Sequence, residues 1–199
     1  MTRPGLAELE ALIILYSRVS RSMGVASIGA AIWYTAGRYS LAALGLADLF
    51  VFVFFGPVAV GGTYYVQALS LPPEVLVAGT GPGLLSIGIL LVNNVRDVAE
   101  DRAAGKRTLV VRFGRRFGIV AYGACVIGAL LVAKVLAFGL VGTETHLWAA
   151  APLLLLPLAV RSTRRMNATT DPEQLNPLLG ATGRILLLWA ILFTIGWNL

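Results

Sequence analysis

Residues 74–94 have the sequence EVLVAGTGPGLLSIGILLVNN, and the polar stretch VRDVAEDRAAGKRTLVVRFGRR follows directly over 95–116. The first stretch is long enough to cross a bilayer as a helix, since about 20 apolar residues suffice. In lipid, the N–H and C=O groups of the backbone are all hydrogen-bonded only in a helix or a closed barrel. The sequence lacks the alternating pattern of barrel strands. The sequence therefore predicts a membrane helix that ends in a charged loop.

Apolar runs of this kind recur along the chain, in which 57% of the 199 residues are hydrophobic and only 13% are charged. That leaves too few polar side chains to cover a soluble domain. We predict an all-α, polytopic transmembrane helical bundle that forms a single membrane domain over 1–199. About six runs have spanning or near-spanning length, the first being the weakest: 22–36, 47–69, 74–94, 117–141, 146–160 and 180–197.

The distribution of charge indicates contact with a membrane rather than with nucleic acid. The net charge is +6, and the 16 Lys and Arg residues cluster at the ends of the apolar runs, so we expect membrane lipid and no nucleic acid as a partner. Two predicted helices separate the basic loops 95–116 and 161–178, which places both loops on the same side of the membrane. The positive-inside rule makes that side cytoplasmic.

Glycine and proline interrupt several of the predicted spans, as in Gly56-Pro57 and the stretch 79–83. Such stretches can bind phosphate in soluble proteins, but here no strand precedes them and no lysine follows at P-loop spacing. We therefore expect close packing of helices and proline kinks at these positions.

The charged loop begins with side chains at helical spacing. If the preceding helix continues, Asn93, Asp97 and Asp101 follow one another at intervals of four residues and share one face. Like charges at this spacing destabilise a helix by about 0.2–0.5 kcal/mol per pair, so the two aspartates need an explanation. Mg²⁺ takes oxygen ligands, commonly one or two carboxylates completed by water and substrate phosphates. Arg96 and other nearby basic residues offer an alternative that needs no metal.

Lys106 and Arg107 follow Gly105, which permits a sharp turn and places cations near the aspartates. Aspartates combined with basic residues hold Mg²⁺–diphosphate and stabilise its charge as it leaves. The alternative is a loop that fixes topology and contains only internal salt bridges.

The string NNVRDVAEDRAAGKRTLVVRFG, residues 93–114, closely resembles the second aspartate-rich motif of the UbiA superfamily of intramembrane prenyltransferases. Within it, the string is most similar to the branch that acts on 1,4-dihydroxy-2-naphthoate. The resemblance extends from about residue 24 to the C-terminus, whereas 1–23 match poorly. Other similar stretches are found at 34–37, 45–56, 62–67 and 175–179.

The resemblance implies a fold and a reaction. The family fold is an all-helical bundle of about nine spans, to whose C-terminal part this chain corresponds. The implied enzyme uses Mg²⁺ to transfer a polyprenyl group from polyprenyl diphosphate to 1,4-dihydroxy-2-naphthoate, giving demethylmenaquinone. The implied location is the bacterial plasma membrane, with the catalytic-type loop 95–116 in the cytoplasm. Two alternatives remain, another aromatic acceptor such as 4-hydroxybenzoate and a non-catalytic membrane transport or structural subunit.

The resemblance also implies roles for individual residues. Asp97 and Asp101 would be the catalytic residues that ligate Mg²⁺. Basic and amide side chains around them would bind the diphosphate, namely Asn93, Asn94, Arg102, Lys106 and Arg107.

The family carries another aspartate-rich motif nearer its N-terminus. The acids that precede Asp97 here do not reproduce its spacing, and they are Glu8, Glu10, Asp48 and Glu74. We therefore expect this chain alone to hold half of the metal site and to have little or no activity.

Overall fold

The computed structural model describes residues 45–142 and 145–199, together with 14, 17–18, 21–22, 24–25 and 28–29. The chain divides into two compact units, Met1–Leu41 and Ala42–Leu199. In the first unit the described residues are helical, and Arg21 Nε donates a hydrogen bond of 3.2 Å to the carbonyl of Ser17. Most of the predicted span 22–36 lies outside the described residues. A single membrane domain over 1–199 stays a prediction.

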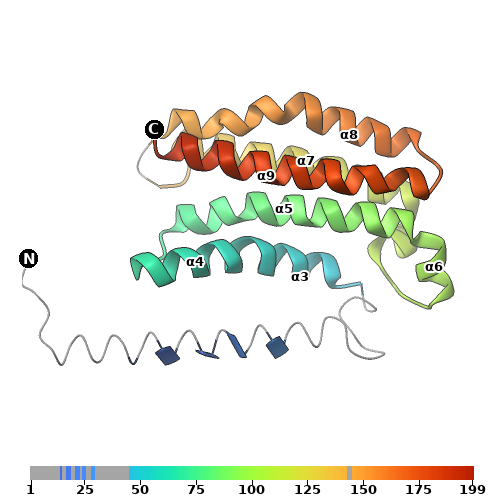
Figure 1. Cartoon of the computed structure of the whole chain (residues 1–199), viewed down its shortest axis with the longest axis horizontal. Helices are drawn as coiled ribbons and strands as arrows, with labels where there is room; N and C mark the ends of the chain where they lie inside the picture. The colour runs from blue at the N-terminus through green and yellow to red at the C-terminus, as the bar shows by residue number, and fades with distance from the viewer. Residues whose placement is uncertain are drawn as a thin grey trace, which may run out of the picture. The chain divides into compact units, whose positions relative to one another are not determined.

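The second unit is a bundle of helices (Figure 1). No strand occurs in its described ranges, 45–142 and 145–199, and the all-α fold class is confirmed. The elements in chain order are α3 (Ala47–Val53), the π-helical turn η1 (Phe54–Val58), α4 (Ala59–Ala68), α5 (Pro73–Arg96), α6 (Val98–Ala103), α7 (Leu109–Ala137), the 3₁₀-helix η2 (Leu147–Leu155), α8 (Leu156–Ala168), the 3₁₀ turn η3 (Glu173–Leu175) and α9 (Asn176–Trp197).

Among the described residues, four segments are long and apolar enough to cross a membrane, which agrees with a polytopic helical membrane protein. They are Ala47–Ala68, Pro73–Arg96, Leu109–Ala137 and Glu173–Trp197, and they match four of the predicted runs. The run 146–160 differs, because it begins as the 3₁₀-helix η2 and becomes α-helical only in α8. Its expected α-helical start was wrong, and Pro152 within η2 gives a reason, since proline removes a backbone donor and crowds the preceding turn.

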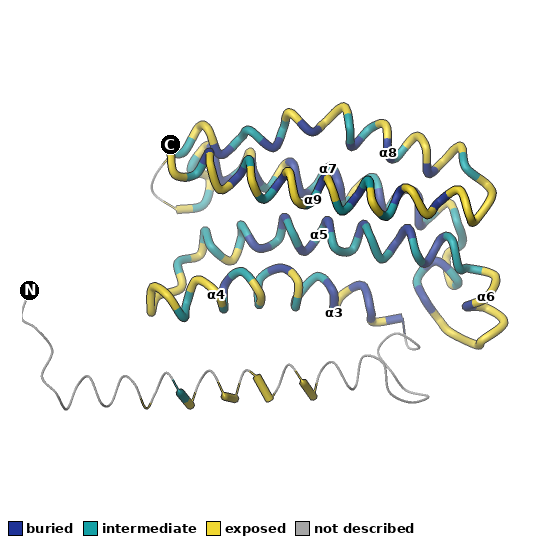
Figure 2. The backbone as a smooth tube through the Cα atoms, in the orientation of Figure 1, coloured by how far each residue is buried: buried dark blue, intermediate teal, exposed yellow. Residues whose placement is uncertain are grey.

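Helix α5 is the centre of the second unit and packs against α7, α9 and the α3–η1 segment. Figure 2 shows α5 mostly in the colours of buried and intermediate residues. Two hydrogen bonds pair polar groups across helices in this core. Trp189 Nε1 donates to the carbonyl of Ala129 at 2.9 Å, and the hydroxyls of Tyr122 and Thr182 lie 2.9 Å apart.

Glycines allow the backbones of α5 and the α3–η1 segment to approach closely. A Cβ atom on Gly79 would lie 2.9 Å from the Cα of Pro57, and one on Gly83 would lie 2.8 Å from the carbonyl oxygen of Phe52. The helix also breaks at Gly56, whose φ of −112° and ψ of −108° are not helical. Packing glycines and a Gly-Pro kink are thus confirmed.

The antiparallel order of the long helices brings both basic loops to one end of the bundle, at the right of Figure 1. We call this end, formed by residues 97–108 and 169–175, the loop end. The start of α3 lies there too, because a Cβ on Gly45 would collide with the carbonyl oxygen of Arg107. The expectation that the two loops share one side is confirmed.

Candidate functional site

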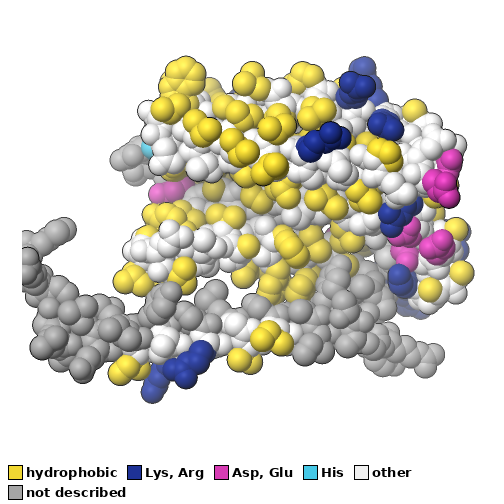
Figure 3. All heavy atoms as spheres, in the orientation of Figure 1, with side chains coloured by type: hydrophobic (Ala, Val, Ile, Leu, Met, Phe, Trp, Pro, Cys, Tyr) yellow, Lys and Arg dark blue, Asp and Glu magenta, His cyan; other side chains and the backbone are white. Residues whose placement is uncertain are grey.

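Charged side chains gather at the loop end. On the face shown in Figure 3, most Lys, Arg, Asp and Glu side chains of the second unit lie toward this end, while hydrophobic side chains cover much of the rest. This distribution suits a helical bundle whose middle lies in lipid and whose loop end meets water.

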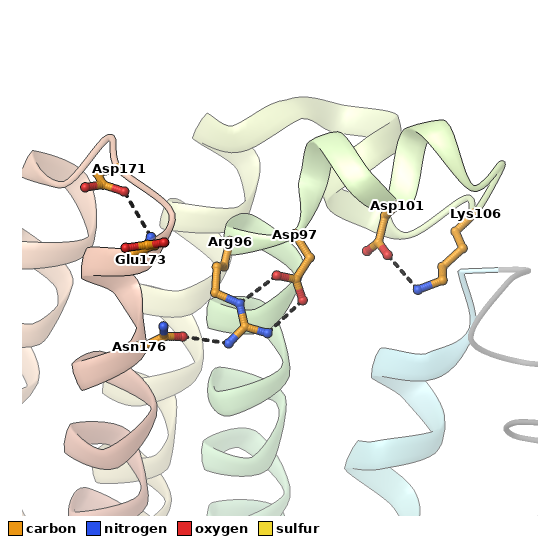
Figure 4. Close-up of polar contacts among 7 residues, drawn as sticks. All are labelled: Arg96, Asp97, Asp101, Lys106, Asp171, Glu173 and Asn176. Carbon is orange, nitrogen blue, oxygen red and sulfur yellow. Dashed lines mark hydrogen bonds and ion pairs between the residues drawn. The ribbon is translucent and has the colours of Figure 1, made fainter.

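The first aspartate of the loop stands at a break between two helices. Helix α5 ends at Arg96, and Asp97, with φ −95° and ψ 11°, separates it from α6. The continuation of the helix, on which the shared face was conditional, is thus interrupted at Asp97, a residue type whose side chain competes with helical backbone bonds. The four-residue hydrogen-bond spacing nevertheless survives, because Asp97 N donates to Asn93 O and Asp101 N donates to Asp97 O, both at 2.8 Å. In Figure 4 the carboxylates of Asp97 and Asp101 leave the same side of this turn, as their spacing predicts.

Asp97 is held by a two-pronged ion pair with its neighbour. Arg96 donates from Nε to Oδ1 at 2.6 Å and from Nη2 to Oδ2 at 2.8 Å, the bidentate geometry that orients a carboxylate firmly. These hydrogen bonds lower the pKa of the Asp97 carboxyl below its usual value. Arg96 Nη1 also donates to Asn176 Oδ1 at 2.8 Å (Figure 4), and Asn176 is the first residue of α9. The end of α5 is thus tied to the start of α9.

Asp101 is held by a different device, the turn that ends α6. Gly105 has a φ of 71°, Lys106 N donates to Asp101 O at 2.9 Å and Gly105 N donates to Arg102 O at 3.1 Å, which together form a Schellman motif. This turn folds Lys106 back over Asp101, and Nζ donates to Oδ1 at 2.7 Å. The Asp101 carboxylate is only 8% exposed, and its hydrogen bond raises the pKa of Lys106. The sharp turn expected at Gly105 is present.

The other residues named from the sequence lie around these two pairs. Asn93 is half-buried and Asn94 is buried, whereas Arg102 and Arg107 are exposed. Asn94 Nδ2 has no hydrogen-bond partner. In this structure Lys106 donates to Asp101, so its contact with phosphate, like those of the other four residues, stays a prediction.

The loop end is also fixed where α7 begins. Thr108 caps α7, since its hydroxyl accepts from Val111 N at 3.2 Å. Arg115 Nη2 donates to the carbonyl of Met166 at 2.8 Å and also to that of Thr169. A cation on these last carbonyls suits the negative end of α8.

Within the described part of the chain, no group of three or more His, Cys, Asp or Glu residues could hold a metal ion. Asp97 and Asp101 alone supply two hard oxygen donors, which suits a cation shared with substrate phosphates better than one enclosed entirely by protein. Each carboxylate already contacts one cationic side chain. The donor set therefore fits Mg²⁺–diphosphate, with Arg96 and Lys106 neutralising the carboxylates in its absence.

Two polar partners of the site were missed by reasoning from the sequence. Asn176 lies in the stretch 175–179 quoted for the resemblance, but it received no role. Arg96 was expected only to offset nearby charge, whereas it links Asp97 to a residue 80 positions away. No spacing rule connects such distant positions, although an asparagine directly before a helix-starting proline marks it as a helix-start residue.

Comparison with known proteins gives a family. The model of the UbiA prenyltransferase family matches residues 7–191, so the match begins inside the segment 1–23. The chain is 40% identical over 174 residues to 1,4-dihydroxy-2-naphthoate octaprenyltransferase of Escherichia coli (strain K12), covering 87% of this chain and 56% of that protein. The Mycobacterium tuberculosis (strain ATCC 25618 / H37Rv) protein of the same name is 38% identical over 170 residues, covering 85% of this chain and 56% of that protein.

A human relative is more distant. UbiA prenyltransferase domain-containing protein 1 of Homo sapiens is 32% identical over 164 residues, covering 82% of this chain and 45% of that protein. The chain thus spans about half the length of the curated relatives it matches. No solved structure matches it.

Proposed function

Because the chain belongs to the UbiA prenyltransferase family, we propose that it acts in the transfer of a polyprenyl group from polyprenyl diphosphate to 1,4-dihydroxy-2-naphthoate. The observation that carries the proposal is the pair of carboxylates, Asp97 and Asp101, on one side of the α5–α6 turn with a cationic partner each. The bacterial relatives are 1,4-dihydroxy-2-naphthoate octaprenyltransferases, which supports the naphthoate as acceptor.

In this proposal Asp97 and Asp101 hold the magnesium end of Mg²⁺–diphosphate. The metal supplies positive charge that stabilises the departing diphosphate. Arg96 keeps Asp97 oriented and ionised through its two hydrogen bonds. Lys106, which donates to Asp101 in this structure, would also donate to a phosphate oxygen, and the exposed Arg102 and Arg107 add positive charge to the same loop.

The proposed reaction breaks the bond between the first prenyl carbon and the diphosphate oxygen, which takes the electron pair. The electron-rich naphthoate ring then supplies the pair for the new carbon–carbon bond. Its carboxylate leaves as CO₂, and the electrons of that bond return to the ring, so the product is the prenylated dihydroxynaphthalene, the reduced form of demethylmenaquinone. Asn93 and Asn94 support the metal end of the site from the last turn of α5. The basic loop end faces the cytoplasm of a bacterial plasma membrane, since its arginines satisfy the positive-inside rule there.

The direct test compares Asp97→Asn and Asp101→Asn with Glu100→Gln, an exposed acid of the same short helix. Each full chain in nanodiscs is assayed for Mg²⁺-dependent binding of farnesyl diphosphate and for transfer to 1,4-dihydroxy-2-naphthoate. We expect each aspartate variant to bind farnesyl diphosphate more weakly in the presence of Mg²⁺ and to lose at least about 100-fold in transfer rate, because an oriented charge-stabilising group contributes that much to a rate. Glu100→Gln should stay within about twofold of the unaltered chain.

The binding measurement keeps this test decisive even where turnover is low, as we expect for the chain alone. Full binding in both aspartate variants, or no binding by the unaltered chain, would contradict the proposal and favour a transport or structural subunit. Transfer to 4-hydroxybenzoate but not to the naphthoate would keep the enzyme class and change the acceptor.

A further inference from the structure

Asp48 is a buried carboxylate without a partner. It lies in the first turn of α3, inside the candidate span Ala47–Ala68, and the residue is 7% exposed. Neither Oδ1 nor Oδ2 has a hydrogen-bond partner. Burial of such a group is costly, and ionisable residues inside membrane helices usually serve a function.

The position of Asp48 relates it to the loop end. Gly45, three residues earlier, touches the Arg107 carbonyl, so the backbone of Asp48 lies within about 10 Å of that contact. From there α3 runs away from the loop end alongside α5 (Figure 1). Asp48 is therefore a buried residue close to the α6–α7 connection, which carries Lys106 and Arg107.

A second unpartnered group lies on the neighbouring helix. Asn94, in the last turns of α5, is 7% exposed, and α5 packs against α3. Across the described residues, the buried side-chain atoms that lack a partner all belong to these two residues: Asp48 Oδ1, Asp48 Oδ2 and Asn94 Nδ2. Other buried polar groups of the bundle, such as the Tyr122 and Thr182 hydroxyls, are paired.

The unpartnered atoms indicate which hydrogen-bonding groups a ligand would need to supply. A carboxylate with both oxygens open needs hydrogen-bond donors, and an amide nitrogen needs an acceptor. The other side chains of α3 are apolar, which favours a hydrophobic molecule that carries a hydroxyl and a second oxygen. An aromatic ring bearing a hydroxyl and a carboxylate has this chemistry.

We propose that Asp48 is the binding residue for the aromatic acceptor: its carboxylate accepts a hydrogen bond from a ring hydroxyl, and Asn94 Nδ2 donates to another oxygen of the same ligand. This inference rests on the proposed function, in which the ring must lie inside the bundle beside the diphosphate. Only the unpartnered Nδ2 of Asn94 is assigned to the acceptor, and its side-chain oxygen keeps its place at the metal end of the site. No proton transfer is assigned to Asp48.

The experiment measures binding of 1-hydroxy-2-naphthoate and of 2-naphthoate, which lacks the hydroxyl, to the full chain in nanodiscs. We expect the unaltered chain to prefer the hydroxylated probe by at least about tenfold, because a site built around a hydroxyl rejects analogues without it. Asp48→Leu should abolish the preference, whereas Glu100→Gln should keep it. Without any probe, Asp48→Leu should also raise the midpoint of thermal unfolding, since it removes an unpaired buried charge.

The second readout separates ligand binding from a structural role. If Asp48→Leu lowers the unfolding midpoint, or keeps the preference for the hydroxyl, or if the unaltered chain shows no preference, the inference is wrong. Its failure is distinguishable from failure of the proposed function, which Asp97→Asn tests through farnesyl diphosphate. Loss of the hydroxyl preference in Asp48→Leu, together with no effect of Asp97→Asn on farnesyl diphosphate, would keep the acceptor site and remove the diphosphate site.

Discussion

The carboxylates at the loop end have cationic partners, whereas the carboxylate in the adjoining interior has none. At the loop end, Asp97 and Asp101 each accept hydrogen bonds from a cation that lies next to them in the sequence or five residues away. In the interior, Asp48 is buried with both oxygens unpartnered. A paired carboxylate is stable without a ligand, and an unpaired one is retained at the expense of stability. The two regions should therefore respond to substitution with opposite changes in stability.

The contrast between the two regions can be tested by leaving Asp101 without a hydrogen-bond partner, as Asp48 is. Lys106→Met removes the partner of a carboxylate that is 8% exposed, and we expect a loss of about 2 kcal/mol in the free energy of unfolding, the cost of an unsatisfied buried acceptor. The measurement is equilibrium unfolding in nanodiscs or detergent. Arg107→Met, at an exposed neighbouring position, is the matched control.

A double substitution completes this test. Adding Asp101→Leu to Lys106→Met should restore much of the lost stability, because no unpaired charge then remains. An equal loss in Lys106→Met and Arg107→Met would show that the Asp101–Lys106 pair has no special weight, and the contrast with Asp48 would fail.

Arg115 is a cation at the loop end that contacts backbone carbonyl groups instead of a carboxylate, and its removal extends the comparison of paired and unpaired groups. Arg115→Leu removes the donor to the Met166 and Thr169 carbonyls at the end of α8. We expect a smaller loss, about 1–1.5 kcal/mol, because water at the loop end can replace part of this cap. Thermal unfolding of Arg115→Leu should be compared with that of Arg116→Leu, which removes the same charge at an exposed position. Equal midpoints for the two variants would contradict the capping role.

The sequence predicted those features that depend on local pattern. Hydropathy and length predicted α5, and the four-residue spacing predicted that Asp97 and Asp101 leave the same side of the chain. Tertiary placement could not be predicted in this way. The Arg96–Asn176 hydrogen bond joins two helices far apart in the sequence, and Asp48 appears in the sequence only as a polar residue at the start of an apolar run. Its burial and its lack of a partner depend on how α3 packs.

The smallest effect concerns the pair at the surface of the loop end. Arg96→Gln removes both hydrogen bonds to Asp97, whose side chain is 31% exposed, so the loss of stability at pH 7 should be below about 1 kcal/mol.

Its pH dependence has a definite sign. The pairing lowers the pKa of Asp97, so its contribution is present above the unfolded value of about 3.9 and is lost as the pH falls through the lowered pKa. The difference in stability between the unaltered chain and Arg96→Gln should therefore shrink to nothing in acid.

An NMR titration of the Asp97 side-chain carboxyl carbon measures the cause directly. Its midpoint should rise in Arg96→Gln toward the ordinary aspartate value, because the guanidinium that favours the ionised form is gone. Asn176→Ala keeps the Arg96–Asp97 contact and removes only the link to α9, so it should leave the midpoint low. Identical midpoints in the unaltered chain and Arg96→Gln would mean that Arg96 does not hold Asp97 in solution. Asp101 would then be the remaining paired carboxylate at the loop end to contrast with the unpaired Asp48.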